Sequence, residues 1–187
     1  MAYPLSAIIS SRKENPYYDV LLYWPLTYAC NLQCVYCWGK SDKKRKKIKK
    51  INCRFLKYSL DKTDKIFLVS CTGGEPFLVP NIVDACAEIT KKHFVRFNTN
   101  LVSGDIEGFT KRIDPKRVWD IEASCHIKEL EKHNLLNKYI YNFSICKDRG
   151  FPIVAVEIAY PALLGEVEKY KEFFKKRGIE LFFTQFC

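Results

Sequence analysis

Three cysteine thiols lie within a short segment near the start of the chain. Cys30, Cys34 and Cys37 follow an apolar stretch with the spacing C-x₃-C-x₂-C. Thiolates this close together suit zinc or an iron–sulfur cluster far better than a hard cation such as magnesium. Because a structural zinc site or a four-iron cluster takes four ligands, the three local thiols leave one metal position for another group to fill.

A second segment has little side-chain bulk. Gly73 and Gly74, with Glu75 and Pro76 after them, come directly after the apolar sequence KIFLVSC. Glycine has no Cβ atom, so a bound ligand can approach this part of the backbone closely. The segment is therefore a candidate binding loop, and a plain turn is the structural alternative.

Strand and helix patterns alternate along the chain and must position these two segments. Strands are expected at residues 19–25, 65–71, 93–99, 118–125, 151–159 and 179–186, with helices at 54–60, 79–92, 106–112, 135–148 and 166–177. Such alternation predicts an α/β fold, a partial (β/α)₆ TIM-like barrel of parallel strands. We expect one core domain at residues 19–187 after an irregular lead-in at residues 1–18.

Three of the expected strands carry polar side chains, although buried parallel strands are normally apolar on both faces. Alternation collects polar residues on one face of each strand: Arg96, Asn98 and Asn100 on the third, Glu122, Ser124 and His126 on the fourth, and Glu157 on the fifth. Because helices cover the outside of a barrel, we expect these side chains to point inward and to bind a polar ligand near the carboxyl ends of the strands. Mutual ion pairing of the charged members is the structural alternative.

The composition excludes several classes of protein. Of the 187 residues 48% are apolar, so a packed core can form and general disorder is excluded. The nine cysteines are accompanied by no visible secretory signal and by no apolar stretch long enough to span a membrane. We therefore expect a protein of the reducing cytoplasm with free or metal-bound thiols. Cys53 and Cys146 have no partner at a metal-ligand spacing. Cys187, at the end of the sixth expected strand, is either a thiol near the substrate or a chance terminal cysteine.

The two motifs, placed after successive predicted strands, give the chain a family resemblance. With Cys30, Cys34 and Cys37 after the first strand and residues 73–76 after the second, it resembles the radical S-adenosylmethionine (SAM) superfamily over residues 19–186. The resemblance implies a [4Fe–4S] cluster on the three thiols, with SAM on the fourth iron. It implies reductive cleavage of SAM to a 5′-deoxyadenosyl radical that abstracts hydrogen from an unidentified substrate. Oxygen sensitivity and an external flavodoxin- or ferredoxin-like electron donor are implied as well.

By the same resemblance, several residues are expected to contact SAM. Tyr36 matches the aromatic position beside the adenine, and the segment Gly73, Gly74, Glu75 and Pro76 matches the loop that bonds to the SAM amino group.

Further along the chain, Ser124 matches a polar residue of the fourth strand that contacts the ribose or carboxylate of SAM. Asn98 and Asn100 resemble the polar end of the third strand, although Leu101 stands where related sequences often have glycine. His126 faces SAM or substrate, or is a structural histidine. No catalytic residue is assigned.

The sequence stops at the sixth strand, without a closing helix or a cysteine-rich extension of the kind that peptide-modifying relatives carry. We therefore expect either a fragment or a core whose open side is covered by a partner protein or a second subunit. An uncovered sheet face is a liability, so the isolated polypeptide is expected to be poorly soluble or oligomeric.

Two other classes of function use the same thiols. Much of the formal charge of +10 lies in a basic run at residues 43–50, from Lys43 to Lys50. Such a run is usually a solvated loop, but with the thiols it could form a zinc or iron–sulfur module that binds nucleic acid. A simple electron carrier is the other class, although a carrier normally has four cysteine ligands. The nucleic-acid-binding module leaves residues 73–76 and the polar strand faces unexplained, and six strand–helix units are more scaffold than a carrier needs, so neither is favoured.

Overall fold

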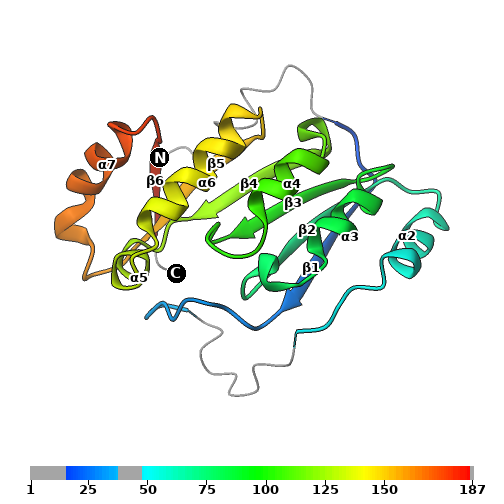
Figure 1. Cartoon of the computed structure of the whole chain (residues 1–187), viewed down its shortest axis with the longest axis horizontal. Coiled ribbons are helices and arrows are strands. Elements are labelled where there is room, and N and C mark those ends of the chain that lie inside the picture. Colours follow the sequence, from blue (N-terminus) through cyan, green and yellow to red (C-terminus); the bar gives the residue numbers. More distant parts are fainter. Residues whose placement is uncertain (1–15, 38–47, 186–187) are drawn as a thin grey trace.

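The computed structural model describes residues 16–37 and 48–185 (Figure 1). Six parallel strands pair in the order of the sequence to form one sheet. They are β1 (Val20–Thr27), β2 (Phe67–Gly73), β3 (Phe94–Thr99), β4 (Val118–Ser124), β5 (Ile153–Ala159) and β6 (Leu181–Gln185). The expected α/β fold is therefore confirmed, as an open sheet of six strands.

Helices follow the strands, as parallel connections require. They are α2 (Cys53–Asp61), α3 (Ile82–Ile89), α4 (Ile106–Arg112), α5 (Ile127–Lys132), α6 (Leu136–Asp148) and α7 (Val167–Lys175). Short 3₁₀ turns lie at Pro76–Leu78, Pro115–Arg117 and Leu164–Glu166. Of these helices only α5 has no counterpart among those expected from the sequence, because six residues are too few for a clear apolar period.

One face of the sheet carries the core. Figure 1 shows α3, α4 and α6 lying across this face. Alternate residues of the central strands are buried against the helices, for example Val69 and Cys71 in β2, Phe97 in β3 and Ala123 in β4. The other face of the sheet carries the second set of alternate residues, and it is on this face that the polar side chains gather.

The face of the sheet that carries the polar side chains is exposed to solvent at β1. Leu21 is 51% exposed and Tyr23 is 67% exposed. Within residues 16–37 and 48–185, no helix is long and apolar enough to cross a membrane. Most of the basic run and Cys187 lie outside the described residues.

Candidate functional site

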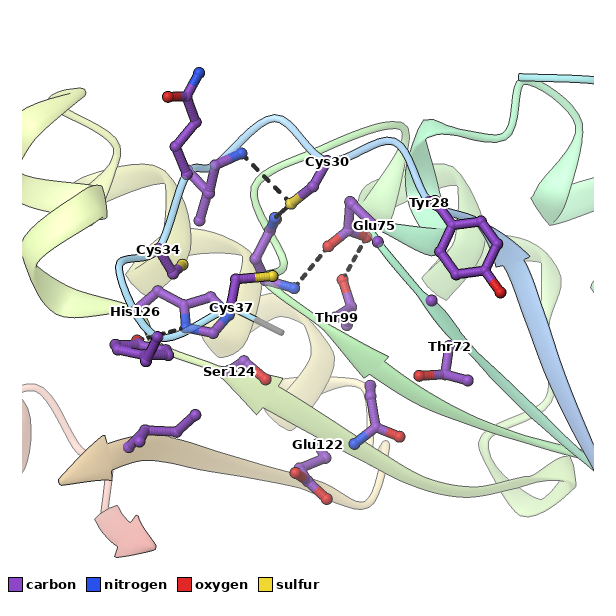
Figure 2. Close-up of a pocket in the computed structure, with 18 of the residues that line it drawn as sticks. Tyr28, Cys30, Cys34, Cys37, Thr72, Glu75, Thr99, Glu122, Ser124 and His126 are labelled. Carbon is purple, nitrogen blue, oxygen red and sulfur yellow. Dashed lines mark hydrogen bonds between the residues drawn. The ribbon is translucent and has the colours of Figure 1, made fainter. Parts of the chain in front are cut away.

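A cavity of about 360 Å³ lies at the carboxyl ends of the strands (Figure 2). Parallel strands bring these ends to one edge of the sheet, where α/β proteins place their binding loops. The cavity is lined mainly by sulfur-bearing, hydroxyl, amide and carboxyl side chains, among them Cys30, Cys34, Tyr36, Cys37, Thr72, Glu75, Asn98, Thr99, Asn100, Glu122, Ser124 and His126. The two motifs and the polar ends of two strands, which are far apart in the sequence, therefore meet at one place.

All three thiols of the motif face this cavity, as Figure 2 shows. Cys34 is buried and Cys37 is exposed. Burial, reinforced by the charge of Cys30, raises the pKa of the Cys34 thiol to about 12, so metal binding must displace a proton here. No three His, Cys, Asp or Glu side chains of the described residues gather closely enough to hold a single metal ion. A cubane cluster takes one thiolate per iron and does not need such a set.

The segment that carries the thiols, residues 30–37, is held by side chains from later parts of the chain; we call it the cysteine loop. The backbone N–H of Gln33 donates to Glu129 Oε2 of α5 at 2.8 Å. The Tyr36 hydroxyl lies 2.8 Å from His126 Nδ1 and donates to Glu157 Oε1 at 3.0 Å. These bonds fix the loop at two points and orient the Tyr36 ring at the cavity wall.

The two glycines at the end of β2 pack against the backbone of residues 27–29, which lead into the cysteine loop. Gly74 N donates to Thr27 O at 2.5 Å, and Glu75 N donates to Ala29 O at 2.8 Å. A Cβ atom on Gly73 would lie 2.3 Å from Thr27 O, and one on Gly74 would lie 2.1 Å from Ala29 O. The close approach that requires glycine is thus made by a neighbouring backbone. Contact of this segment with SAM stays a prediction.

Glu75 is fully buried, and both of its carboxylate oxygens are occupied (Figure 2). Oε1 accepts from Phe77 N at 2.9 Å and from Thr99 Oγ1 at 2.7 Å, and Oε2 accepts from Asn100 N at 2.7 Å. Burial raises the pKa of Glu75 to about 7, although these hydrogen bonds oppose the shift. The side chain therefore fastens the loop after β2 to the end of β3, while Pro76 begins a buried 3₁₀ turn.

Replacing Glu75 is expected to destabilise the protein in a pH-dependent way. Glu75→Ala leaves three buried donors without an acceptor, which costs about 3 kcal/mol at pH 5. Because the folded pKa of about 7 lies above the ordinary 4.5, the contribution of Glu75 is complete below about pH 4.5 and is lost as the pH rises through 7. The difference in free energy of unfolding between wild type and variant should therefore shrink between pH 5 and pH 8, as measured by urea unfolding. Exposed Glu168→Ala is the control, and an equal Glu75→Ala effect at both pH values would contradict the prediction.

The polar residues expected at the ends of the third and fourth strands line the cavity. The register places Asn98 beside Glu122, and Ser124 and His126 follow along the same face. Burial raises the pKa of the Glu122 carboxyl, although Arg96 and Asn98 act in the opposite direction. Burial lowers the pKa of His126 to about 4, so this ring is neutral at physiological pH. Their roles toward SAM stay predictions.

Two charged side chains were expected to point into the cavity and do not line it. Arg96 instead forms an ion pair with Asp120, at 3.1 Å between Nε and Oδ1. The sequence had not indicated Asp120. Glu157 does not point inward, so that prediction is wrong. Its strand carries Ile158 on the cavity side, which leaves Glu157 on the opposite face. There its carboxylate accepts from Ile127 N, at the start of α5, at 2.5 Å.

Sequence reasoning missed other residues of the site. Tyr23 and Thr72 line the cavity, and extending the alternation of polar residues to the first two strands would have found them. Glu129 was missed because nothing in the sequence near residue 129 indicates a contact with a loop 96 positions earlier.

The chain matches the family model described as the radical SAM superfamily over residues 24–176. It is similar to mycofactocin maturase MftC, with 32% identity over 103 residues to the Mycobacterium tuberculosis protein and 34% identity over 126 residues to that of Mycolicibacterium smegmatis. These matches cover 54% and 66% of this chain but 26% and 30% of the relatives, so the chain spans less than a third of their length.

Solved structures show the same fold. A structure described as native anSMEcpe with bound AdoMet matches with a TM-score of 0.65 and 16% identity, covering 89% of this chain and 51% of that chain. Streptococcus suis SuiB bound to the precursor peptide SuiA matches with a TM-score of 0.60 and 17% identity, covering 89% and 39%. The likeness supports the partial barrel expected from the sequence.

Proposed function

The chain belongs to the radical SAM superfamily, as its motifs predicted, and we propose that its cavity binds a [4Fe–4S] cluster and SAM for radical chemistry on a substrate. The observation that carries this proposal is the meeting of the three thiols with Gly73, Gly74 and Glu75 at one cavity. The zinc module and the electron carrier offer no reason for this juxtaposition.

The residues present fit such a cluster. Three thiolates form a soft donor set, and polar side chains line the space beside them. Cys30, Cys34 and Cys37 would hold three irons, which leaves the fourth for SAM. The chemistry that the cluster supplies when bound is one-electron reduction of SAM to methionine and a 5′-deoxyadenosyl radical, which abstracts hydrogen from the substrate.

The chain itself binds and orients the co-substrate. Tyr36, fixed by His126 and Glu157, presents a rigid aromatic side chain where the adenine is expected. Asn98 and Ser124 offer amide and hydroxyl groups on the strand ends for hydrogen bonds to SAM. Residues 73–75, fastened by the Glu75 side chain, form part of the cavity wall beside the end of β3.

Several finer features form part of the proposal. A peptide is the substrate class that we favour, since the similar protein MftC is a maturase and SuiB was solved with a precursor peptide. An external flavodoxin- or ferredoxin-like protein would supply electrons in the cytoplasm, and the cluster would make the protein oxygen-sensitive. The core would occupy residues 19–187. Exposure of Leu21 and Tyr23 on the cavity side of the sheet supports a second protein surface that covers this side.

Anaerobic reconstitution tests the proposal. The protein is loaded with iron and sulfide, reduced with dithionite and given SAM, and 5′-deoxyadenosine is measured. We expect about four irons per chain and formation of 5′-deoxyadenosine. A full cluster without SAM cleavage would overturn the enzymatic proposal, and zinc without iron after anaerobic purification would favour the nucleic-acid-binding alternative.

A further inference from the structure

We propose that Asn100 is a positioning residue for the cluster, because its side-chain amide holds the cysteine loop and donates a hydrogen bond to the sulfur of Cys30. This inference rests on the proposed function, and it adds a determinant of the reduction potential.

Asn100 lies directly after β3 and its side chain contacts the cysteine loop. It is only 3% exposed. Its Nδ2 lies 2.8 Å from Asn31 Oδ1 and 3.8 Å from Cys30 Sγ. Both acceptors belong to the cysteine loop, so one amide group contacts a proposed cluster ligand and the residue next to it.

The orientation of this amide is determined by a third hydrogen bond. Val102 N donates to Asn100 Oδ1 at 3.1 Å. A backbone N–H can only donate, so the oxygen must face Val102 and the NH₂ group must face Cys30. The backbone N–H of Asn100 donates to Glu75 Oε2 at 2.7 Å. Main chain and side chain are therefore both fixed.

Leu101, the residue after Asn100, has a strained backbone conformation. Leu101 has φ of +62°, which is unfavourable for a leucine. Two bonds hold it there: Leu101 N donates to Thr99 Oγ1 at 3.0 Å, and Asn142 Nδ2 donates to Leu101 O at 2.7 Å. Strain that the surroundings hold in place is typical of positions that present a functional side chain.

A donor to a ligating sulfur has a direct electronic consequence. Reduction adds negative charge to the cluster and its thiolates, and an N–H···S hydrogen bond stabilises that charge. Hydrogen bonds to the sulfurs are among the factors that determine the reduction potentials of iron–sulfur clusters. Removing the Asn100 amide should therefore lower the potential, an effect that a purely structural anchor would not produce.

The test is the midpoint potential of the reconstituted cluster without SAM, measured by electron paramagnetic resonance during a redox titration. For Asn100→Leu, which fills the space without a donor, we expect the equilibrium constant for reduction to fall about tenfold, or about 59 mV for a one-electron couple. Asn100→Asp, which keeps the acceptor for Val102 N and adds negative charge, should shift the potential further in the same direction. Asn81→Ala removes an amide outside the cavity that donates to the sulfur of Cys53 at 3.3 Å, and it should leave the potential unchanged.

The outcomes separate the two proposals. A wild-type protein that assembles no cluster overturns both. A cluster that assembles and has the same potential in the wild type, in Asn100→Leu and in Asn81→Ala overturns the role of Asn100 and leaves the proposed function intact. If circular dichroism shows that Asn100→Leu does not fold, Asn100→Asp decides in its place, and an unshifted or raised potential in that variant overturns the inference.

Discussion

Cys34→Ala is expected to abolish cluster assembly and, with it, SAM cleavage. Cys34 is the most buried of the three thiols, with 6% exposure, and its loss leaves only two cysteines in the loop. Changes around metal ligands already cost 10- to 100-fold in metal affinity or activity, so loss of a ligand should lower 5′-deoxyadenosine formation by more than about 100-fold. The measurements are iron content and 5′-deoxyadenosine after anaerobic reconstitution.

The matched control for this prediction is Cys53→Ala. Cys53 begins α2 outside the cavity, and its thiol donates to Ile51 O at 3.6 Å. Its replacement should leave the iron content at the wild-type level. A Cys34→Ala protein that still holds a full cluster would show that the three thiols are not the ligand set.

Gly74→Ala is expected to disrupt the site through the backbone. The added Cβ would lie 2.1 Å from Ala29 O and 2.8 Å from the carbonyl carbon of Tyr28. These are backbone atoms, so relief requires moving the strand that leads into the cysteine loop and breaking the bonds from Gly74 and Glu75 to it. Overpacking alone costs about 1–3 kcal/mol, and the lost hydrogen bonds add about 1 kcal/mol each. Urea unfolding should show this loss, and reconstituted iron content should fall with it.

Gly165→Ala provides the comparison for that variant. A Cβ atom at Gly165 meets nothing within 4 Å, so the free energy of unfolding should change by no more than about 0.5 kcal/mol. Equal stability of the Gly74 and Gly165 variants would contradict the close packing of the two loops.

The fold could be predicted from local patterns. Strand–helix alternation predicts parallel order because each connection must return the chain to the same edge of the sheet. Helix α4 occupies the residues expected for it, 106–112, because Asp105 caps its start by accepting from Gly108 N and the extended Ile113 follows its end. The cysteine motif and the glycine pair are also recognisable from short segments. Because they follow two neighbouring parallel strands, their meeting at one edge of the sheet could be predicted.

The remaining parts of the site depend on which face of a strand a residue occupies and on contacts between residues far apart in the sequence. Glu157 was assigned to the wrong face, since a displacement of one residue along a strand exchanges inside and outside. The sequence of residues 73–76 does not reveal whether Glu75 faces a ligand or the protein. The same four residues are compatible with a glutamate that binds a ligand and with a buried one that accepts hydrogen bonds from the backbone. The contact of Asn100 with Cys30 joins residues 70 positions apart, beyond any local pattern.

The anchoring of the cysteine loop implies an order of events during biosynthesis. The loop is complete after residue 37, but Gln33 finds Glu129 only 96 residues later and Tyr36 finds Glu157 only 121 residues later. At about 5–20 residues per second, ribosomes need roughly 6–24 s to make that stretch. During this interval the thiols are present without the groups that hold them. We therefore expect the proposed cluster to be inserted late, into a chain in which at least five of the six strands have been made.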